Sequence, residues 1–256
     1  MAPYQLSNEP EARGKTMEDR TLERTLNELT AQITHTYGET LLAVILYGSA
    51  ASDEFVEGRS NINCLVLLKQ VTPDELKKSS PLLQNWHEQG IRTPLFVDPA
   101  YVRSAIDVFP IEFLDMKQRY RVLYGQDFLR DLDVKLDHLR FQCEQELKGK
   151  MLRLRQLYLE TSQSESRLMT LLAKSASSFM ILFRALLHLN GISATHSAQE
   201  LFAGLTSLGL PNEAIARVYA LRRDQPAPTH ANMDALFRQY LSEIETVVEF
   251  SETTRP

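Results

Sequence analysis

Two short apolar runs near the N-terminus, joined by a polar loop, constrain the fold of this chain more than any other feature. Residues 41–47 and 62–68 are mostly apolar, and each run has the length of one strand. Continuous apolar runs of this length are typical of strands that are buried in a sheet. Gly48 ends the first run, so we expect the chain to turn there.

The segments around these runs alternate between helical and extended patterns. A helix is predicted at 18–37, where apolar residues recur at helical spacing. A second helix is predicted from Thr72 to Gly90, with an interruption at Pro81, because Thr72-Pro73 has the pattern of a capped helix start. Further extended segments are predicted at 93–97, 111–116 and 121–124.

After about residue 132, the patterned segments are all helical. Helices are predicted at 136–159, 165–189, 198–208, 212–221 and 233–250. Strands that alternate with helices, followed by helices alone, indicate a domain of mixed strands and helices and then an all-α helical bundle. We place a flexible tail at 1–16, the α+β domain at 17–132 and the helical bundle at 133–256.

Composition and charge argue against several classes of function. The formal net charge of −5 provides no general attraction to nucleic acid, so a nucleic-acid partner is not expected. Cys64 and Cys143 lack metal-ligand spacing, so no metal site is predicted from them. The polar start lacks a signal-peptide core and no apolar run is long enough to cross a bilayer, so we expect a cytoplasmic protein without a membrane partner.

The turn after the first apolar run and the start of the second offer polar groups to a phosphate. The first strand ends in Gly48-Ser49, which would expose backbone N–H groups and a hydroxyl at the start of a helix. Asn61 and Asn63 are two residues apart in an extended segment, so their side chains point to the same side. We therefore expect these four residues to bind a nucleotide. The alternative is an ordinary turn with a capping serine and two asparagines that cap loops.

This spacing resembles the DNA polymerase β-like nucleotidyltransferase superfamily, especially its small bacterial and aminoglycoside nucleotidyltransferase members. Their signature is an apolar strand, Gly-Ser or Gly-Gly, a loop of this length, and Asp-apolar-Asp in the next strand. The resemblance covers 22–124, and it extends to the remainder only as architecture, because several members carry a helical bundle behind the palm. It implies a nucleotidyltransferase palm, which is an α+β domain with a mixed sheet, for the first half of the chain.

Asn61 and Asn63 stand where this superfamily has two aspartates. Those aspartates hold magnesium ions, which bridge the nucleotide phosphates and stabilise the transferring phosphoryl group. Two amides carry no charge, so the resemblance implies no metal site at these positions and a severe loss of metal-dependent transfer. ATP could still bind without magnesium, because less negative charge would face its phosphates.

The superfamily also uses a third acid on a neighbouring strand, and the resemblance places Phe96 at that position. Three residual acids, Asp98, Glu112 and Asp115, are the candidates to rebuild a metal site for magnesium. Asp98 precedes Pro99, a position that favours a helix cap instead.

A basic cluster lies in the first long helix of the second half. Lys148 and Lys150 would bind nucleotide phosphates if this helix faces the α+β domain. The alternative is a solvated face on which they pair with acids one turn away.

Histidines indicate no further catalytic motif. The segment 223–230 has the spacing of the Arg-x-His motif of the HEPN ribonucleases, but its two prolines favour a loop. His35, His87 and His138 have no evident partners in the sequence, and we expect surface or capping roles for them.

The sequence therefore predicts a catalytically degenerate protein of nucleotidyltransferase fold that binds a nucleotide or a partner in the cleft between its domains. Two alternatives stay open. One is an active, metal-dependent enzyme that moves a nucleoside monophosphate from ATP to a hydroxyl of a small molecule or protein. The other is an interaction scaffold, whose helical bundle forms a homodimer or binds a protein partner.

Overall fold

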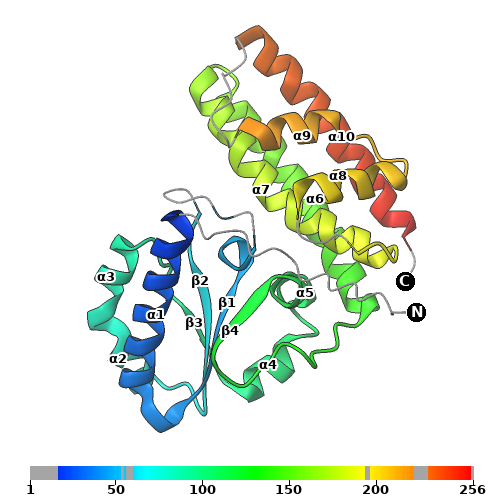
Figure 1. The fold of residues 1–256 in the computed structure, drawn as a ribbon. Coiled ribbons are helices and arrows are strands. Elements are labelled where there is room, and N and C mark those ends of the chain that lie inside the picture. The colour runs from blue at the N-terminus through cyan, green and yellow to red at the C-terminus, as the bar shows by residue number, and fades with distance from the viewer. Residues whose placement is uncertain (1–16, 53–54, 56–59, 194–196, 222–229, 255–256) are drawn as a thin grey trace, which may run out of the picture.

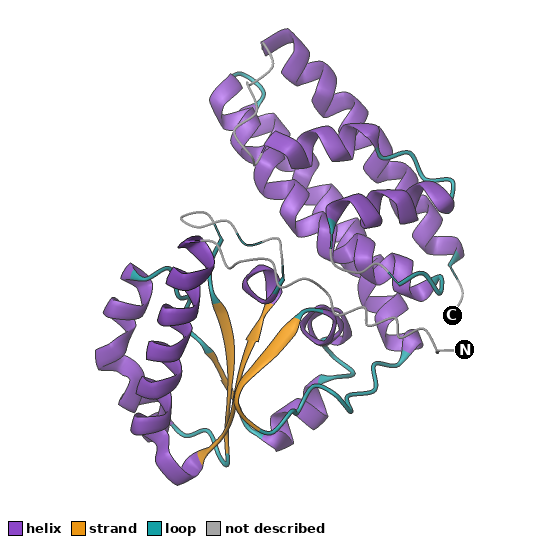
Figure 2. Cartoon of the chain, in the orientation of Figure 1, coloured by secondary structure: helices purple, strands orange, loops and turns teal. Residues whose placement is uncertain are grey.

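The computed structural model describes residues 17–52, 55, 60–193, 197–221 and 230–254 (Figure 1). Its first half combines a sheet with helices, and its second half contains helices among the described residues (Figure 2). The prediction of an α+β half with a mixed sheet, followed by a helical region, is confirmed.

The sheet has four strands in the order β3-β2-β1-β4. Strand β1 pairs antiparallel with β2 and with β4, whereas β2 pairs parallel with β3, so the sheet is mixed. The elements of this half are α1 (Met17–Tyr37), η1 (Gly38–Thr40), β1 (Leu41–Tyr47), η2 (Gly48–Ala51), β2 (Asn63–Leu68), α2 (Pro73–Ser79), η3 (Ser80–Leu82), α3 (Leu83–Glu88), β3 (Leu95–Val97), α4 (Pro99–Ala105), α5 (Pro110–Gln118) and β4 (Tyr120–Gly125).

Helices cover both faces of the sheet (Figure 1). Alternate side chains of β1 point to opposite faces, as the two-residue period of a strand requires. Val44 and Leu46 pack in one core with α1 and with Trp86 of α3. Ala43 and Ile45 pack in the other core, with residues of α4 and α5. Burial on both faces explains why the strand reads as a continuous apolar run.

The helical half consists of α6 (Leu136–Thr161), α7 (Glu165–Leu189), α8 (Ala198–Ser207), α9 (Glu213–Ala220) and α10 (His230–Thr253). Helix α7 is central, because its side chains are buried over much of its length. Phe179 of α7 packs edge to face against Tyr240 of α10, with ring centroids 6.3 Å apart. Such aromatic pairs add to the apolar burial that stabilises the core.

The segment 111–116, which the sequence analysis predicts as extended, is helical and forms most of α5. Its apolar residues face two ways: Ile111 and Leu114 join the core of the helical half, and Phe113 and Met116 join the core beside the sheet. A short helix buried on two sides reads as a continuous apolar run, which the pattern alone does not distinguish from a strand. Pro110 occupies the first position of α5, a position that proline favours.

Helix α7 also corrects the expectation that no apolar segment is long enough to cross a bilayer. By length and composition alone, Glu165–Leu189 meets that requirement. Most of its apolar window is buried within the chain, however, as in the core helix of a globular protein. The apolar character of α7 is therefore accounted for by packing inside the helical half.

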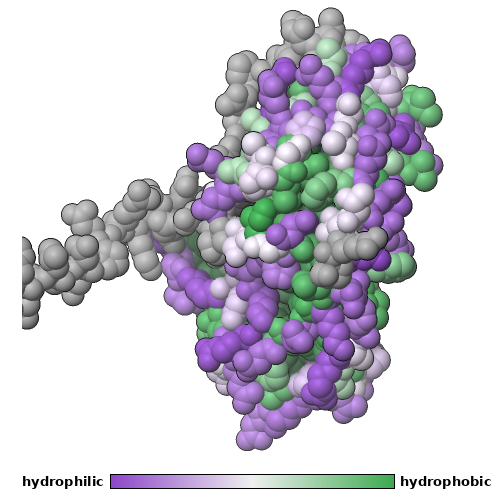
Figure 3. Space-filling view, turned by 90° about the vertical axis from the view of Figure 1, so that its right-hand side faces the viewer, coloured by the Kyte–Doolittle hydropathy of each residue, from purple (hydrophilic) through white to green (hydrophobic). Residues whose placement is uncertain are grey.

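The surface of the molecule carries apolar patches between polar ones, as the side view in Figure 3 shows. On α6, the large apolar side chains of Phe141, Leu152 and Leu159 are exposed. Their spacings of 11 and 7 residues place them on one side of the helix. A partner bound through the helical half stays a prediction.

Candidate functional site

The turn after β1 lies beside the second asparagine. Tyr47, the last residue of β1, is the register partner of Asn63 on β2. Gly48 has φ +78°, and a Cβ atom at this position would lie 3.5 Å from Asn63 Nδ2. The Gly48 N–H donates to the carbonyl of Arg119 at 3.0 Å, which fixes the turn against the start of β4. The expected proximity of Gly48 and Asn63 is therefore present in the structure.

Asn61 and Asn63 line the same pocket, which has a volume of about 480 Å³. Asn63 Nδ2 also donates to the backbone carbonyl of Asn61 at 3.4 Å. A pocket of this size suits a small organic ligand. Its described lining consists of Tyr47, Asn61, Asn63, His87, Gly90, Ile91, Arg92, Thr93 and Leu95. All of these belong to the α+β half, so the pocket is at the end of the sheet rather than between the two halves.

The Gly48-Ser49 turn differs from the expected start of a helix. Residues Gly48–Ala51 form a single 3-10 turn, in which the Ser49 carbonyl accepts from the Ser52 N–H at 3.1 Å. A turn this short offers few free N–H groups to a phosphate. Neither Gly48 nor Ser49 belongs to the described lining of the pocket.

One wall of the pocket contains residues that were not expected at the site. The Ile62 N–H donates to the Gly90 carbonyl at 3.0 Å, and the Arg92 N–H donates to the Ile62 carbonyl at 3.0 Å. This pairing brings the segment after α3 alongside the asparagines. His87, for which a surface or capping role is predicted, lines the pocket, and its Nε2 lies 3.0 Å from Thr93 Oγ1. The sequence gives no signal for this wall, because the parallel pairing of residues 62 and 91 depends on tertiary structure.

Tyr47 lines the pocket with a neutral phenol. Burial raises the pKa of Tyr47 to about 12, and nearby Cys64 and Asp115 add to the shift, whereas Arg92 opposes it. The hydroxyl therefore stays protonated at neutral pH and can donate a hydrogen bond. Among the described lining residues, Arg92 is the side chain with a permanent positive charge.

Two of the three residual acids have structural partners outside the pocket. Asp98 caps α4, because its Oδ1 accepts from the Tyr101 N–H at 2.8 Å. Glu112 on α5 accepts from Gln142 Nε2 of α6 at 2.9 Å. The helix cap that the Asp98-Pro99 pattern favours is therefore present.

Asp115, the third residual acid, pairs with two buried arginines. Its Oδ1 lies 2.8 Å from Arg119 Nη2 and 3.8 Å from Arg184 Nη1. None of the three acids belongs to the described lining of the pocket.

The described lining does not fit a magnesium ion. It offers two amides and an arginine but no carboxylate, whereas magnesium is normally held by carboxylates and phosphates. Among the described residues there is no group of three or more His, Cys, Asp or Glu side chains that could hold a metal ion. Asp53, Glu54 and Glu57 of the intervening loop lie outside the described residues, as does most of the 223–230 motif.

Lys148 and Lys150, expected to bind phosphates, pair with glutamates instead. Lys148 Nζ lies 2.8 Å from Glu144 Oε1 and 2.9 Å from Glu252 Oε1 of α10. Lys150 Nζ lies 3.2 Å from Glu146 Oε2. Neither lysine lines the pocket at the end of the sheet. These ion pairs fit the alternative stated above, in which the lysines lie on a solvated face and pair with acids.

No protein-family model and no curated protein matches this sequence. Among solved structures, the chain is similar to spectinomycin adenyltransferase AAD(9) from Enterococcus faecialis, whose structure contains ATP and spectinomycin. The match has a TM-score of 0.47 and 11% sequence identity, and it covers 87% of this chain and 99% of that chain. A likeness at this score bears on neither the activity nor the site of this chain.

Proposed function

We propose that this chain is a protein of nucleotidyltransferase fold that binds a nucleotide in the pocket at the end of the sheet, without a metal ion and without transferring it. The observation that carries the proposal is the shared pocket of Asn61 and Asn63, which also contains Arg92. The motif that resembles the superfamily, an apolar strand, Gly48-Ser49 and a second strand, adds to this support.

The chemistry of the lining suits phosphates that arrive without magnesium. An arginine can hold two phosphate oxygens at once through its planar guanidinium, and it supplies positive charge where a metal ion otherwise would. The amide nitrogens of Asn61 and Asn63 are further donors, and Thr93 adds a hydroxyl. Aspartates in place of the asparagines would repel the phosphates unless a cation lay between them.

Isothermal titration of ATP, with magnesium and with EDTA, tests the proposal on this chain and on Asn61→Asp/Asn63→Asp. We expect the unmodified chain to bind ATP equally well in both buffers. The double variant should bind only when magnesium is present. Arg92→Ala should weaken binding by roughly tenfold or more, since a hydrogen bond to a charged group contributes about 1.5–3 kcal/mol.

Arg103→Ala is the matched control, because Arg103 is exposed on α4 and does not line the pocket. Its affinity for ATP should equal that of the unmodified chain. A requirement for magnesium in the unmodified chain would show that carboxylates elsewhere hold a metal, and the enzyme alternative would replace the proposal. Absence of binding by ATP, GTP, CTP and UTP would refute it.

A further inference from the structure

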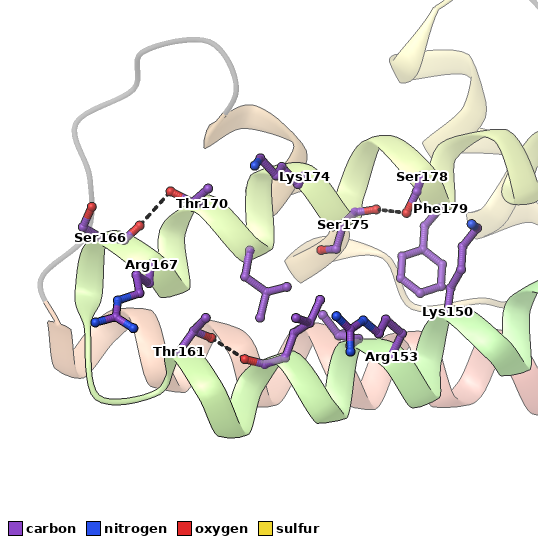
Figure 4. A pocket seen from close by; sticks show the side chains of 13 residues that line it. Lys150, Arg153, Thr161, Ser166, Arg167, Thr170, Lys174, Ser175, Ser178 and Phe179 are labelled. Carbon is purple, nitrogen blue, oxygen red and sulfur yellow. Dashed lines mark hydrogen bonds between the residues drawn. The ribbon is translucent and has the colours of Figure 1, made fainter.

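Helices α6 and α7 line a second cavity, open to solvent and of about 540 Å³, far from the asparagines in sequence and in the other half of the chain (Figure 4). Its floor is apolar and is formed by Leu154, Leu157, Leu171 and Phe179. This volume lies in the range of cavities that hold small organic ligands. The cavity shares no described lining residue with the pocket at the end of the sheet.

Four cations surround this apolar floor. Lys150 and Arg153 come from α6, and Arg167 and Lys174 come from α7. Figure 4 shows Lys150 rising from α6 toward α7, Arg153 lying along α6, and Arg167 extending from α7 toward α6. The described lining contains no aspartate or glutamate. This local excess of positive charge contrasts with the formal net charge of −5 of the whole chain.

Most of these cations have charge available for a ligand. Lys150 pairs with Glu146 at 3.2 Å, and Arg153 donates to the neutral Gln156 Oε1 at 3.3 Å. Within the part of the chain that the structure describes, no carboxylate forms an ion pair with Arg153, Arg167 or Lys174. An anion in the cavity would therefore gain attraction without displacing an internal partner.

Most hydroxyl groups of the walls already donate to the backbone. Thr161 Oγ1 donates to the Leu157 carbonyl at 2.7 Å, and Thr170 Oγ1 donates to the Ser166 carbonyl at 2.8 Å. Ser178 Oγ likewise donates to the Ser175 carbonyl at 2.8 Å. Each of these hydroxyls has a single proton to donate, so the cations are the stronger donors left for an acid group.

The depth of the floor limits what can occupy the cavity. Leu154, Leu171 and Phe179 are 2%, 8% and 1% exposed, respectively. Side chains with so little exposed area offer a bilayer or a flat protein surface few apolar contacts. A slim molecule that enters between the helices can reach them and bury its own apolar surface.

We propose that the cavity between α6 and α7 binds a free small molecule with an apolar body and one terminal acid group, such as a medium-chain carboxylic acid. The apolar body would lie on the leucines and Phe179, and the acid group would bind the cations at the rim. This charge complementarity is independent of nucleotide binding at the end of the sheet.

Isothermal titration with decanoate, below its micellar concentration, tests the proposal on the full chain. We expect decanoate to bind at least about tenfold more tightly than decanol, because the acid gains charge-assisted hydrogen bonds. Affinity should fall as salt is raised, because the rim cations are partly exposed and are screened by salt. Titration with decyl phosphate distinguishes a site for carboxylates from one for phosphate esters. Tighter binding of decyl phosphate than of decanoate would overturn the assignment to a carboxylic acid.

Two variants examine the rim without altering the floor. Arg167→Gln/Lys174→Gln removes two exposed charges, and we expect it to weaken decanoate binding by about tenfold or more. Thr170→Glu places a negative charge on the wall and should abolish binding. The matched control is Lys77→Gln/Arg103→Gln, which removes two exposed charges from the other half and should bind decanoate normally.

Four outcomes would overturn the proposal. Equal affinity for decanoate and decanol would show a cavity that is merely apolar. An equal loss of decanoate affinity in Arg167→Gln/Lys174→Gln and in the control Lys77→Gln/Arg103→Gln would show a general effect of net charge. Absence of decanoate binding would show that the cavity does not take this class of ligand. A dimer in sedimentation that Thr170→Glu dissociates would show that the α6–α7 face is an interface between two copies of the chain.

Discussion

Arg184 Nη1 on α7 lies 3.8 Å from Asp115 Oδ1 on α5, so an ion pair joins the helical half to the α+β half. Arg119 Nη2 shares the same carboxylate oxygen at 2.8 Å, and both arginines are buried. Asp115 therefore stabilises the junction between the halves, whereas the resemblance to nucleotidyltransferases made it a candidate metal ligand.

Asp115→Asn should lower the free energy of unfolding by about 3 kcal/mol, because buried guanidinium groups lose the carboxylate that they share. Urea unfolding followed by circular dichroism measures the change. Asp107→Asn, which neutralises an exposed aspartate near the end of α4, should have little effect. Equal stability of the two variants would contradict a structural role for Asp115.

Asp98→Ala should lower the free energy of unfolding by about 1 kcal/mol, the usual contribution of a helix N-cap, and leave ATP binding unchanged. Thr72→Ala is the matched change, because the Thr72 hydroxyl caps α2 by accepting from the Glu75 N–H at 3.2 Å. Urea unfolding measures the contribution of each residue to stability as a helix cap, and ATP titration measures its contribution to the site. Weaker ATP binding in Asp98→Ala alone would show that this acid serves the site.

Gly125→Ala should be among the most destabilising single changes in the chain. Gly125 has φ +77°, and a Cβ atom there would lie 2.0 Å from the Leu42 carbonyl oxygen. Backbone strain and the clash together should lower the free energy of unfolding by about 2–5 kcal/mol. Gly209 has φ +76° and open space around its Cβ position, so Gly209→Ala should show the strain alone, about 1–2 kcal/mol. Thermal unfolding of both variants separates the two effects, and similar losses would rule out the clash.

The buried cysteines should make the protein less stable at alkaline pH. Burial raises the pKa of both Cys64 and Cys143 to about 12, from 9.0 for an exposed thiol. Between these values the unfolded chain releases thiol protons that the native chain retains, so stability present below pH 9 is lost as the pH rises. The loss from pH 8 to pH 10 should be about 1 kcal/mol for each thiol.

Urea unfolding at the two pH values, on the unmodified chain and on Cys64→Ala/Cys143→Ala, measures this loss. The double variant should be less stable at pH 8, because it loses buried volume, but it should lose less stability on going to pH 10. Equal losses in the two proteins would assign the alkaline sensitivity to other groups.

Local patterns predicted the elements of the fold well where one physical signal dominated. The apolar period of 165–189 coincides with α7, and the interruption at Pro81 coincides with the break between α2 and α3. Capping chemistry placed the starts of α2 and α4. The prediction of an extended segment at 111–116 was wrong, because burial on two sides removes the helical period. The local pattern therefore resembled that of a strand.

The candidate site was predictable only in part. The two-residue period of a strand placed Asn61 and Asn63 on one side, and the structure brings both into one pocket. Arg92 and His87 could not be predicted, because they reach the site through pairing between segments about thirty residues apart. The boundary between the halves at 132 and 133 stays a prediction.

Helix α5 has a consequence for how the chain folds. Ile111 and Leu114 complete the core of the helical half, although they precede it in sequence, while Phe113 and Met116 of the same helix complete the core beside the sheet. A fragment that ends at residue 132 would leave the first pair in water, and a fragment that begins at 133 would lack them. Because the two cores share this short helix, we expect the unfolding of one half to be coupled to that of the other.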